Sequence, residues 1–523
     1  MIVEQLAAID LIIIALFIGY ICWRGFSYLK GQKTSEDYFL AGRSLTWPLI
    51  GFSLYASNMS SSSIIGLSGS GYNTGISVFN YEWVGIIILV IFAIYFVPLY
   101  FRSKLFTMPE LLEKRFDYRS RYYFSTLTII INIGIDAAGA LYAGSLLLQL
   151  VIPTIDLTTS IIILALITGI YTMAGGLKAV VFTDIVQGVL LTLGSLIITI
   201  LLFLQIGSWD EMVNAAGSDK MSLIRPIDDE FMPWPTLILS LPILSFYFWC
   251  SHQHIVQRVL GANSVEDGRK GALLAGMLKL PVLFIMILPG VMAIGMYPDL
   301  DNPNMILPKL MIDLLPAGLL GLVLVGFIAA LMSSIDSSLN SASTLVTMDF
   351  YKKFRPESDQ KELVIIGRIF TFVFVLIASL WAPYIDQFPT LWEYLQASLS
   401  YLIPPVVVCF LFGLFWKKAT STGAFISLIS GGLIALIFIG LYQLNLLPEI
   451  HYLYVATVLF VTSSLILIIF SKLFPDAKDT DNEVILLFRE KETRPHTGSF
   501  LSDYRFFAGV LMLFTIGIVL FFW

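Results

Sequence analysis

The sequence is poor in charge and in the side chains that form disulfides or bind metals. Only 13% of its 523 residues are charged, whereas soluble globular proteins have roughly 25%. Its three cysteines, Cys22, Cys250 and Cys409, all lie in apolar stretches, which argues against a disulfide framework or a thiolate metal site. No block of basic residues indicates a nucleic-acid partner, and the net charge of −6 identifies no partner either.

Hydrophobic residues, in contrast, make up 57% of the chain. Runs of about 20 apolar residues predict membrane-spanning helices. The first run lacks the basic residues and the cleavage site of a signal peptide, so we expect it to be a span. We therefore predict an all-α polytopic membrane protein without a soluble domain. The fourteen predicted spans are 6–24, 47–70, 76–101, 121–151, 157–174, 180–206, 234–257, 271–297, 317–349, 365–383, 389–416, 421–443, 451–471 and 505–523.

Lysine and arginine positions predict how the spans are oriented. If the connection after the first span is cytoplasmic and the sides alternate, 27 of the 31 basic residues lie on the cytoplasmic side. Three lie outside, and Lys279 falls inside a span. Because cytoplasmic loops are rich in Lys and Arg, we expect both termini to lie outside a cell membrane, together with the acidic loop 206–232.

A cluster of hydroxyl groups interrupts the second predicted span. Six of the seven residues from Ser57 to Ser63 are polar, and hydrocarbon offers such groups no hydrogen bonds. One or two hydroxyls on one face would fit close helix packing, but this run is polar all round a helix. Such a stretch lines water or surrounds unwound backbone, so we predict that the second span is a broken helix.

A matching interruption is expected in the seventh span, between Ser240 and Arg258. Pro242 removes a backbone hydrogen bond, and several polar residues follow. The second and seventh spans each begin a block of five helices, and interrupted spans at corresponding positions indicate inverted repeats with a site near the midplane. His252 and His254 are two residues apart, so we expect them to face different sides and to line a polar cavity rather than bind zinc.

The ninth span places oxygen donors on one helix face. Ala330, Ser333 and Ser334 stand at positions i, i+3 and i+4, which are neighbours on a helix. In most helices such serines are packing residues. Here, carbonyl oxygens released where the second span unwinds would complete a compact oxygen site. Because sodium is a hard cation that prefers oxygen ligands, the pattern favours a sodium site.

Six ionisable residues fall inside predicted spans, where charges are costly and indicate functional positions. Any one of them has an equally good structural explanation, such as a pair with a neighbouring helix. Asp336, for example, either helps a second cation site or bonds to Asn340 one turn on. A helix bundle that neither binds nor transports anything, however, has no need of six ionisable residues in its spans. They are Glu82, Asp136, Asp184, Lys279, Asp336 and Glu393.

Several stretches, taken together and in order, resemble the sodium/solute symporter family, most closely its sodium–glucose branch. A single motif, such as the double glycine within 171–187, would be weak support, but the set of motifs extends along essentially the whole chain. The stretches are TSEDYFLAGRSL (34–45), ASNMS (56–60), GSGY (69–72), YEW (81–83), TMPELLEKRF (107–116), YTMAGGLKAVVFTDIVQ (171–187), QRVLGANS (257–264), MSSIDSSLNSASTLVTMDFY (332–351) and GLFWKKATSTGA (413–424).

The resemblance implies a LeuT-like fold, with two inverted five-helix repeats and broken helices, and sodium-driven uptake by alternating access. It implies one transmembrane transporter domain over 1–523, made of an extra helix at 6–24, repeats at 47–206 and 234–416, and further helices at 421–523. The family's main sodium site falls on the backbone oxygens of Ala56, Met59 and Ala330 and the hydroxyls of Ser333 and Ser334, with Asp184 nearby. The solute pocket falls on Asn58, Glu82, Lys279 and Gln396, with aromatic gates at Tyr81 and Trp392 outside and Phe248 and Trp249 inside.

Three positions depart from the sugar-transporting relatives that the chain resembles. Ser63 replaces a larger polar residue that contacts the substrate, Ser245 replaces an asparagine, and Phe248 replaces a tyrosine at the inner gate. Each change shortens or removes a polar group. Either the solute is bulkier, or water fills the space, or the cargo is another polyol or an acid sugar.

The function predicted from the sequence is sodium-coupled import of a sugar or polyol, with Na⁺ as the coupling ion. The partners expected are a small solute and the lipid bilayer. One alternative is a sodium symporter for a carboxylated solute, such as sialic acid or an amino acid. Another is a membrane sensor that binds solute without moving it. We do not expect an enzyme, because the midplane residues offer no nucleophile–base pair at a recognisable spacing.

Overall fold

Nearly all of the described chain is helical. The computed structural model describes residues 6–28, 40–152, 154–444, 446, 450–475, 483–489 and 503–523, without the side chains of 18, 21–28, 150–151, 170–185, 187 and 443. Within these ranges the structure contains helices and two isolated β-bridges, and no strand. The predicted all-α class is confirmed.

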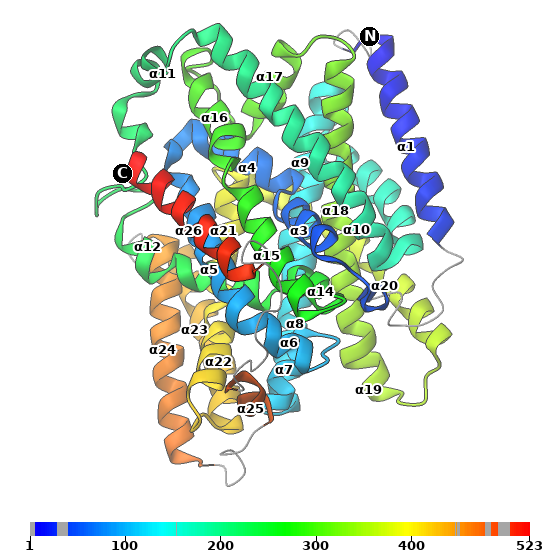
Figure 1. Ribbon diagram of the computed structural model, residues 1–523, viewed down its shortest axis with the longest axis vertical. Coiled ribbons are helices and arrows are strands. Elements are labelled where there is room, and N and C mark those ends of the chain that lie inside the picture. The colour runs from blue at the N-terminus through cyan, green and yellow to red at the C-terminus, as the bar shows by residue number, and fades with distance from the viewer. Residues whose placement is uncertain are drawn as a thin grey trace.

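The helices are arranged as Figure 1 shows. In the first half they are α1 (Ala8–Tyr28), α3 (Trp47–Asn58), α4 (Ser61–Thr74), α5 (Asn80–Ile91), α6 (Val97–Arg102), α7 (Met108–Arg115), α8 (Tyr118–Ile130), α9 (Ala138–Val151), α10 (Leu157–Ile206), α11 (Trp209–Ala216), α12 (Pro235–Leu239), α13 (Leu241–Phe246) and α14 (Gln253–Leu260). In the second half they are α15 (Val265–Lys279), α16 (Leu288–Met292), α17 (Ile306–Leu314), α18 (Leu319–Leu345), α19 (Lys352–Phe354), α20 (Gln360–Trp381), α21 (Leu391–Leu402), α22 (Pro404–Phe415), α23 (Ser421–Gln443), α24 (Tyr452–Leu473), α25 (Glu483–Arg489) and α26 (Tyr504–Phe521).

Several spans contain a π-helical turn, in which one extra residue widens the helix. These turns are η3 (Phe92–Phe96), η4 (Ile131–Ala137), η6 (Tyr247–Ser251), η7 (Leu283–Ile287) and η10 (Val346–Tyr351). Such turns are rare and occur frequently at functional sites. Here η4 and η6 contain residues that line the central cavity described below.

Each predicted span overlaps helical segments of the structure. In the described part of the chain, eight helical segments are long and apolar enough to cross a membrane, and two bent pairs raise the number to ten. The bends are 42° after Lys279 and 53° before Pro404, and a proline removes the local backbone hydrogen bond at each, Pro281 and Pro404. α10 covers the ranges predicted for the fifth and sixth spans. The total of fourteen therefore stays a prediction.

The second span is broken, as the serine cluster predicts. α3 ends at Asn58, and Met59 leaves helical geometry with φ −83° and ψ 57°. Ser60 is extended, with ψ 165°, and its side chain caps α4 by accepting a hydrogen bond from the Ser63 amide. The Ser60 hydroxyl thus replaces one of the hydrogen bonds that the unwound backbone gives up in a membrane.

The seventh span leaves helical geometry at the end of η6; beside its proline it is only divided into α12 and α13 at Ser240, which stays in the helical region (φ −113°, ψ −48°). Pro242 lies in the first turn of α13, where its missing N–H is tolerated. The break is at His252, which is extended, with φ −69° and ψ 120°, between η6 and α14. The predicted range is therefore confirmed, while the break itself lies ten residues beyond the proline.

The two ends of the molecule differ in the connections they contain. Figure 1 shows α11, α17 and the first turn of α1 at one end, and α7, α19 and α25 at the other. This places α11, in the acidic loop 206–232, at the same end as the first turn of α1 and opposite α7 and α19, which carry basic residues. α18 runs through the centre between them, and the span from Leu319 to Phe354 is 83% buried over its apolar window.

Several arginines that were assigned to cytoplasmic loops are in fact buried. Arg258 is 1% exposed, and its guanidinium donates to the hydroxyls of Ser53 and Ser337, both at 2.7 Å. It therefore joins α14 to α3 and α18, close to the second break. Arg269 is also buried. Charge counting identifies the end of the molecule on which such a residue lies, but not whether it faces solvent.

Candidate functional site

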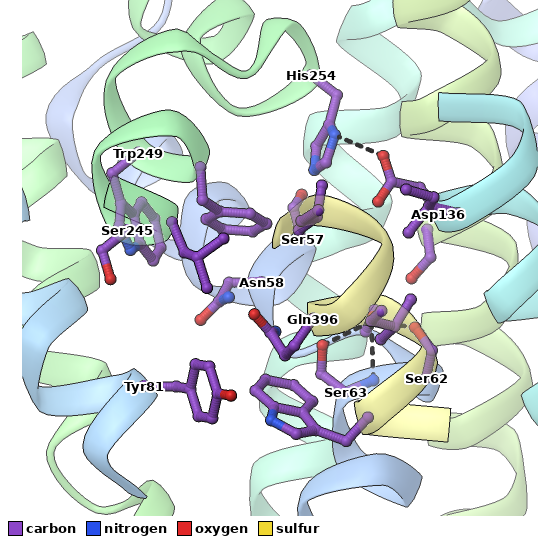
Figure 2. Close-up of a pocket in the computed structure, with 18 of the residues that line it drawn as sticks. Ser57, Asn58, Ser62, Ser63, Tyr81, Asp136, Ser245, Trp249, His254 and Gln396 are labelled. Atoms are coloured by element: carbon purple, nitrogen blue, oxygen red, sulfur yellow. Dashed lines mark hydrogen bonds and ion pairs between the residues drawn. The ribbon is translucent and has the colours of Figure 1, made fainter. Parts of the chain in front are cut away.

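A central cavity lies between the two helix breaks (Figure 2). Its walls come from both broken spans and from α5, η4, α15, α18 and α21. The lining residues are Ser57, Asn58, Ser60, Ser62, Ser63, Tyr81, Glu82, Ile135, Asp136, Leu244, Ser245, Phe248, Trp249, His254, Lys279, Ser334, Ser337, Ser338, Trp392, Leu395, Gln396 and Leu399.

All ten residues expected to contact solute line this one cavity. They are Asn58, Ser63, Tyr81, Glu82, Ser245, Phe248, Trp249, Lys279, Trp392 and Gln396. They come from both predicted repeats, so the chain brings together residues more than 300 positions apart. Whether each contacts solute stays a prediction, but the grouping itself is a property of the fold.

Lys279 forms the electrostatic centre of the cavity. Its ammonium lies 2.6 Å from the Glu82 carboxylate and donates to the Asn58 side-chain oxygen at 2.5 Å. It also lies 4.7 Å from the centre of the Trp249 ring, within cation–π range. Both members of the ion pair are at most 2% exposed. The lysine therefore contacts both broken spans and partly neutralises the glutamate, which lowers the cost of burying either charge.

Aromatic rings close two sides of the cavity. The Tyr81 and Trp392 rings meet edge to face with centroids 5.5 Å apart. Phe248 and Trp249 make a similar contact at 5.0 Å. These are the pairs that the sequence assigns to the outer and inner gates. The Tyr81 hydroxyl also bonds to the Tyr452 hydroxyl at 2.9 Å, so α24 supports the first pair.

Serine hydroxyls form the wall at the first break. Ser60 Oγ lies 2.8 Å from Ser62 Oγ and 2.9 Å from Ser63 Oγ. Ser57 Oγ has no hydrogen-bond partner among the described residues. These groups are therefore partly satisfied by one another and partly free to bond to whatever enters the cavity.

Ala56 and Met59, two of the predicted sodium ligands, lie at the same break, and a third, Ser334, lines the cavity beside it. Because α3 ends at Asn58, the carbonyl of Ala56 is among the last of that helix, which lack intrahelical partners. Met59 is the residue at which the helix unwinds. α18 contacts both α3 and α4. There the Ser334 hydroxyl lines the cavity and donates to the Ala330 carbonyl at 2.8 Å, which leaves its oxygen lone pairs available to a cation.

Two of the residues expected at the sodium site are not seen to line the cavity. Ser333 is buried beside Ser334 and does not line the cavity. The side chain of Asp184 lies outside the described residues.

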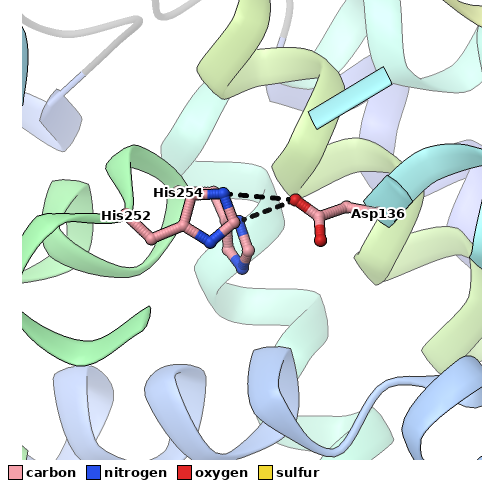
Figure 3. A group of neighbouring side chains, drawn as sticks. All are labelled: Asp136, His252 and His254. Carbon is pink, nitrogen blue, oxygen red and sulfur yellow. Dashed lines mark ion pairs between the residues drawn. The ribbon is translucent and has the colours of Figure 1, made fainter. Parts of the chain in front are cut away.

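The expectation that His252 and His254 face different sides is wrong. Their ring centroids are 4.3 Å apart, and both point towards Asp136 (Figure 3). Helical spacing does not apply here because His252 is the extended residue between two helices. The expectation that they line a cavity holds for His254 alone.

Other lining residues were not among the predicted solute contacts. Besides His254 and Ser334, which the sequence assigns to other roles, they are Ser57, Ser60, Ser62, Asp136, Ser337 and Ser338, together with the apolar Ile135, Leu244, Leu395 and Leu399. The serines belong to clusters that the sequence shows, and Asp136 is an ionisable residue in a span. The sequence therefore contained a feature that could have identified the polar lining residues, whereas it contained none that could have identified the apolar ones.

Comparison with known proteins identifies the family. A profile of the sodium:solute symporter family matches residues 38–431. The chain belongs to this family. The human sodium/myo-inositol cotransporter is 36% identical, over 89% of this chain and 73% of the relative. The rabbit sodium/glucose cotransporter 1 is 35% identical, over 87% and 77%.

A solved structure supports the LeuT-like fold that the sequence predicts. The substrate-bound outward-open state of a Na⁺-coupled sialic acid symporter matches with a TM-score of 0.79 and 24% identity, covering 90% of this chain and 99% of that one. As a member of the sodium:solute symporter family, the chain is a multi-pass membrane transporter and not an enzyme. The predicted LeuT-like fold is confirmed, and the family supports sodium as the coupling ion.

Proposed function

We propose that this protein is a sodium-coupled symporter that imports an uncharged polyhydroxylated solute, a hexose or an inositol, by alternating access. The relatives in hand are named for myo-inositol and glucose. The cavity offers the matching chemistry, because carboxylate, amide, ammonium and hydroxyl groups bond to hydroxyls that both donate and accept. The aromatic rings cover the apolar C–H face of such a solute.

The observation that favours an uncharged solute is the Glu82–Lys279 pair. Lys279 is the single lysine or arginine among the described residues that line the cavity, and its ammonium is held by Glu82 at 2.6 Å. A carboxylated solute would need a free cation there, or would have to displace the glutamate from its partner. A neutral polyol bonds to both members and leaves the pair intact.

The sodium site is proposed at the first break. Its ligands are the backbone oxygens of Ala56, Met59 and Ala330 and the hydroxyls of Ser333 and Ser334, with Asp184 nearby. All are hard oxygen donors, which suits an alkali cation. An ion held here joins α3 to α18 and stabilises the arrangement of Ser57 and Asn58 in the cavity wall. Sodium and solute then favour each other's binding reciprocally.

The driving force is sufficient for accumulation. One charge that crosses about 100 mV contributes roughly 2.3 kcal/mol, and a tenfold sodium gradient adds about 1.4 kcal/mol. With one sodium ion per solute, these terms support accumulation of roughly 500-fold.

The arrangement in the membrane follows from the same proposal. The repeats at 47–206 and 234–416 form the transport core, and 6–24 and 421–523 are additional helices. In a cell membrane, the end of the molecule with α7, α19 and α25 faces the cytoplasm, and both termini lie outside.

Uptake into proteoliposomes tests the function. With an inward sodium gradient we expect accumulation of labelled myo-inositol or glucose, abolished when potassium replaces sodium. Competition with sialic acid and amino acids separates the carboxylate alternative, since strong competition by these alone would contradict the proposal. Counterflow in preloaded vesicles distinguishes transport from sensing, because a sensor exchanges no labelled solute.

A further inference from the structure

Two histidines and an aspartate meet beside the solute cavity, on two different spans. His252 and His254 come from the break in the seventh span, and Asp136 comes from the π-helical turn η4 of the fourth (Figure 3). Asp136 Oδ2 lies 3.3 Å from His252 Nε2 and 3.5 Å from His254 Nδ1. One donor atom from each of the three residues lies within 4.8 Å of the other two.

These separations fit a tetrahedral metal ion. Ligands at about 2.0–2.1 Å from a tetrahedral Zn²⁺ are roughly 3.3 Å from one another. Asn132 supplies a fourth donor, because its side-chain oxygen lies 3.0 Å from His252 Nε2. Its amide nitrogen donates to Ser341 Oγ at 2.7 Å, which aims the oxygen at the cluster. The set is two imidazoles, one carboxylate and one amide oxygen.

The Asp136 carboxylate also favours a cation, and the nearest guanidinium, that of Arg258, donates to the His254 backbone carbonyl and not to the carboxylate. Among the described residues, the recorded ion-pair partners of Asp136 are the two histidines alone. Neither Asp136 Oδ2 nor His254 Nδ1 has a hydrogen-bond partner there, and both histidines are at most 5% exposed. The Asp136 side chain is 19% exposed, and a carboxylate at membrane depth without a lysine or arginine partner is costly. A divalent ion would supply positive charge and bind Asp136 Oδ2 and His254 Nδ1, which among the described residues otherwise face only each other and His252.

We propose that Asp136, His252 and His254, with Asn132, form a binding site for a divalent transition-metal ion of the zinc class. Imidazole nitrogen donors distinguish this site from the all-oxygen sodium site at the first break. Binding requires neutral imidazoles, with the remaining proton of His252 on Nδ1 and that of His254 on Nε2. The ion ties η4 to the break in the seventh span and fixes part of the cavity wall, since Asp136 and His254 line it. Bound metal therefore inhibits uptake.

Cobalt titration of the purified transporter, without a polyhistidine tag, tests the site directly. Tetrahedral Co²⁺ gives strong visible absorption, so we expect a saturable spectrum with one ion per chain that Zn²⁺ displaces. Asp136→Asn or His254→Ala removes a direct ligand and should weaken cobalt binding by at least the roughly hundredfold that loss of a ligand's hydrogen-bond partner can cost. The His252→Ala/His254→Ala double variant should abolish the spectrum. Absence of a saturable tetrahedral spectrum in the unaltered protein would overturn the proposal, whatever its transport activity.

A control and a second measurement keep the result independent of folding. His451 lies outside the cluster, with its Nε2 3.1 Å from the Phe231 carbonyl oxygen, so His451→Gln should bind cobalt normally. X-ray absorption of the zinc-loaded, unaltered protein should show two imidazole nitrogens and two oxygens. A zinc coordination shell with fewer than two imidazole ligands would overturn the proposed metal site. In proteoliposomes, micromolar Zn²⁺ should reduce uptake and EDTA should restore it, and full uptake with zinc bound would contradict the inhibitory role.

Discussion

The two helix breaks use the same backbone device with different side chains. At each, one residue adopts extended geometry before a new helix begins, Ser60 with ψ 165° and His252 with ψ 120°. Ser60 caps the following helix with its own hydroxyl, whereas His252 makes no side-chain cap. The first break is surrounded by hydroxyl and carbonyl oxygens, and the second by imidazoles facing a carboxylate.

Under the two proposals made above, the backbone break makes room for a cation and the side chains around it select which cation binds. Hard oxygen donors suit sodium, and imidazole suits zinc-class ions. Lys279 links the two places, because its ammonium contacts Asn58 at the end of α3 and the Trp249 ring in η6. The comparison can be tested by substituting Lys279 first, and then the hydroxyl-bearing residues Ser334, Ser60 and Tyr452 one at a time.

The largest effect is expected from Lys279→Met. It leaves Glu82 buried without its partner, which typically costs about 3–5 kcal/mol, and it disconnects the two breaks. We expect thermal stability in detergent to fall and sodium-driven uptake to drop at least about a hundredfold. The Glu82→Gln/Lys279→Met double variant should recover stability without recovering uptake. If Lys279→Met alone transports normally, the link between the breaks has no function.

Ser334→Ala should act on the first break alone. Loss of one sodium ligand should raise the half-saturating sodium concentration by about tenfold, equivalent to about 1.4 kcal/mol. Solute affinity at fixed sodium should fall with it through linkage. Ser343→Ala is the matched control, because Ser343 is on the same helix and also donates to a carbonyl, that of Asn340, outside the cavity. Unchanged sodium dependence in Ser334→Ala would count against this ion site.

Ser60→Ala should weaken the helix start that the first break depends on. Loss of the cap on α4 should reduce stability by about 1 kcal/mol, measured as a lower unfolding temperature in the same detergent. Ser60→Thr retains an oxygen for the Ser63 amide and should stay close to the unaltered protein. Equal unfolding temperatures for all three proteins would mean that the cap contributes nothing.

The smallest effect is expected at the outer aromatic pair. Tyr452→Phe removes the hydroxyl that bonds to Tyr81, a loss of about 0.5–1.5 kcal/mol, so half-saturating solute should rise no more than about tenfold. If the two hydroxyls act through one bond, Tyr81→Phe/Tyr452→Phe should be no worse than either single change. Additive effects of the two substitutions would show that the bond is not what supports the gate.

The sequence predicted which residues line the cavity better than it predicted which side chains contact one another. Polar clusters located both breaks, and the family resemblance located ten residues that line one cavity. It did not predict that His252 and His254 lie side by side, because one extended residue cancels the helical spacing on which that expectation relied. Nor did it predict that Arg258 is buried or that Tyr452 meets Tyr81, since neither contact follows from local pattern.

The sequence by itself determined that the chain is a helical membrane protein with two broken spans. The physical reason is local: hydrocarbon accepts apolar helices and forces polar runs to find partners close by. Only the tertiary structure decided which distant groups became those partners, such as Glu82 with Lys279 and Asp136 with the two histidines. Those pairs depend on how helices pack and on the backbone angles of single residues at the breaks, which a linear pattern does not specify.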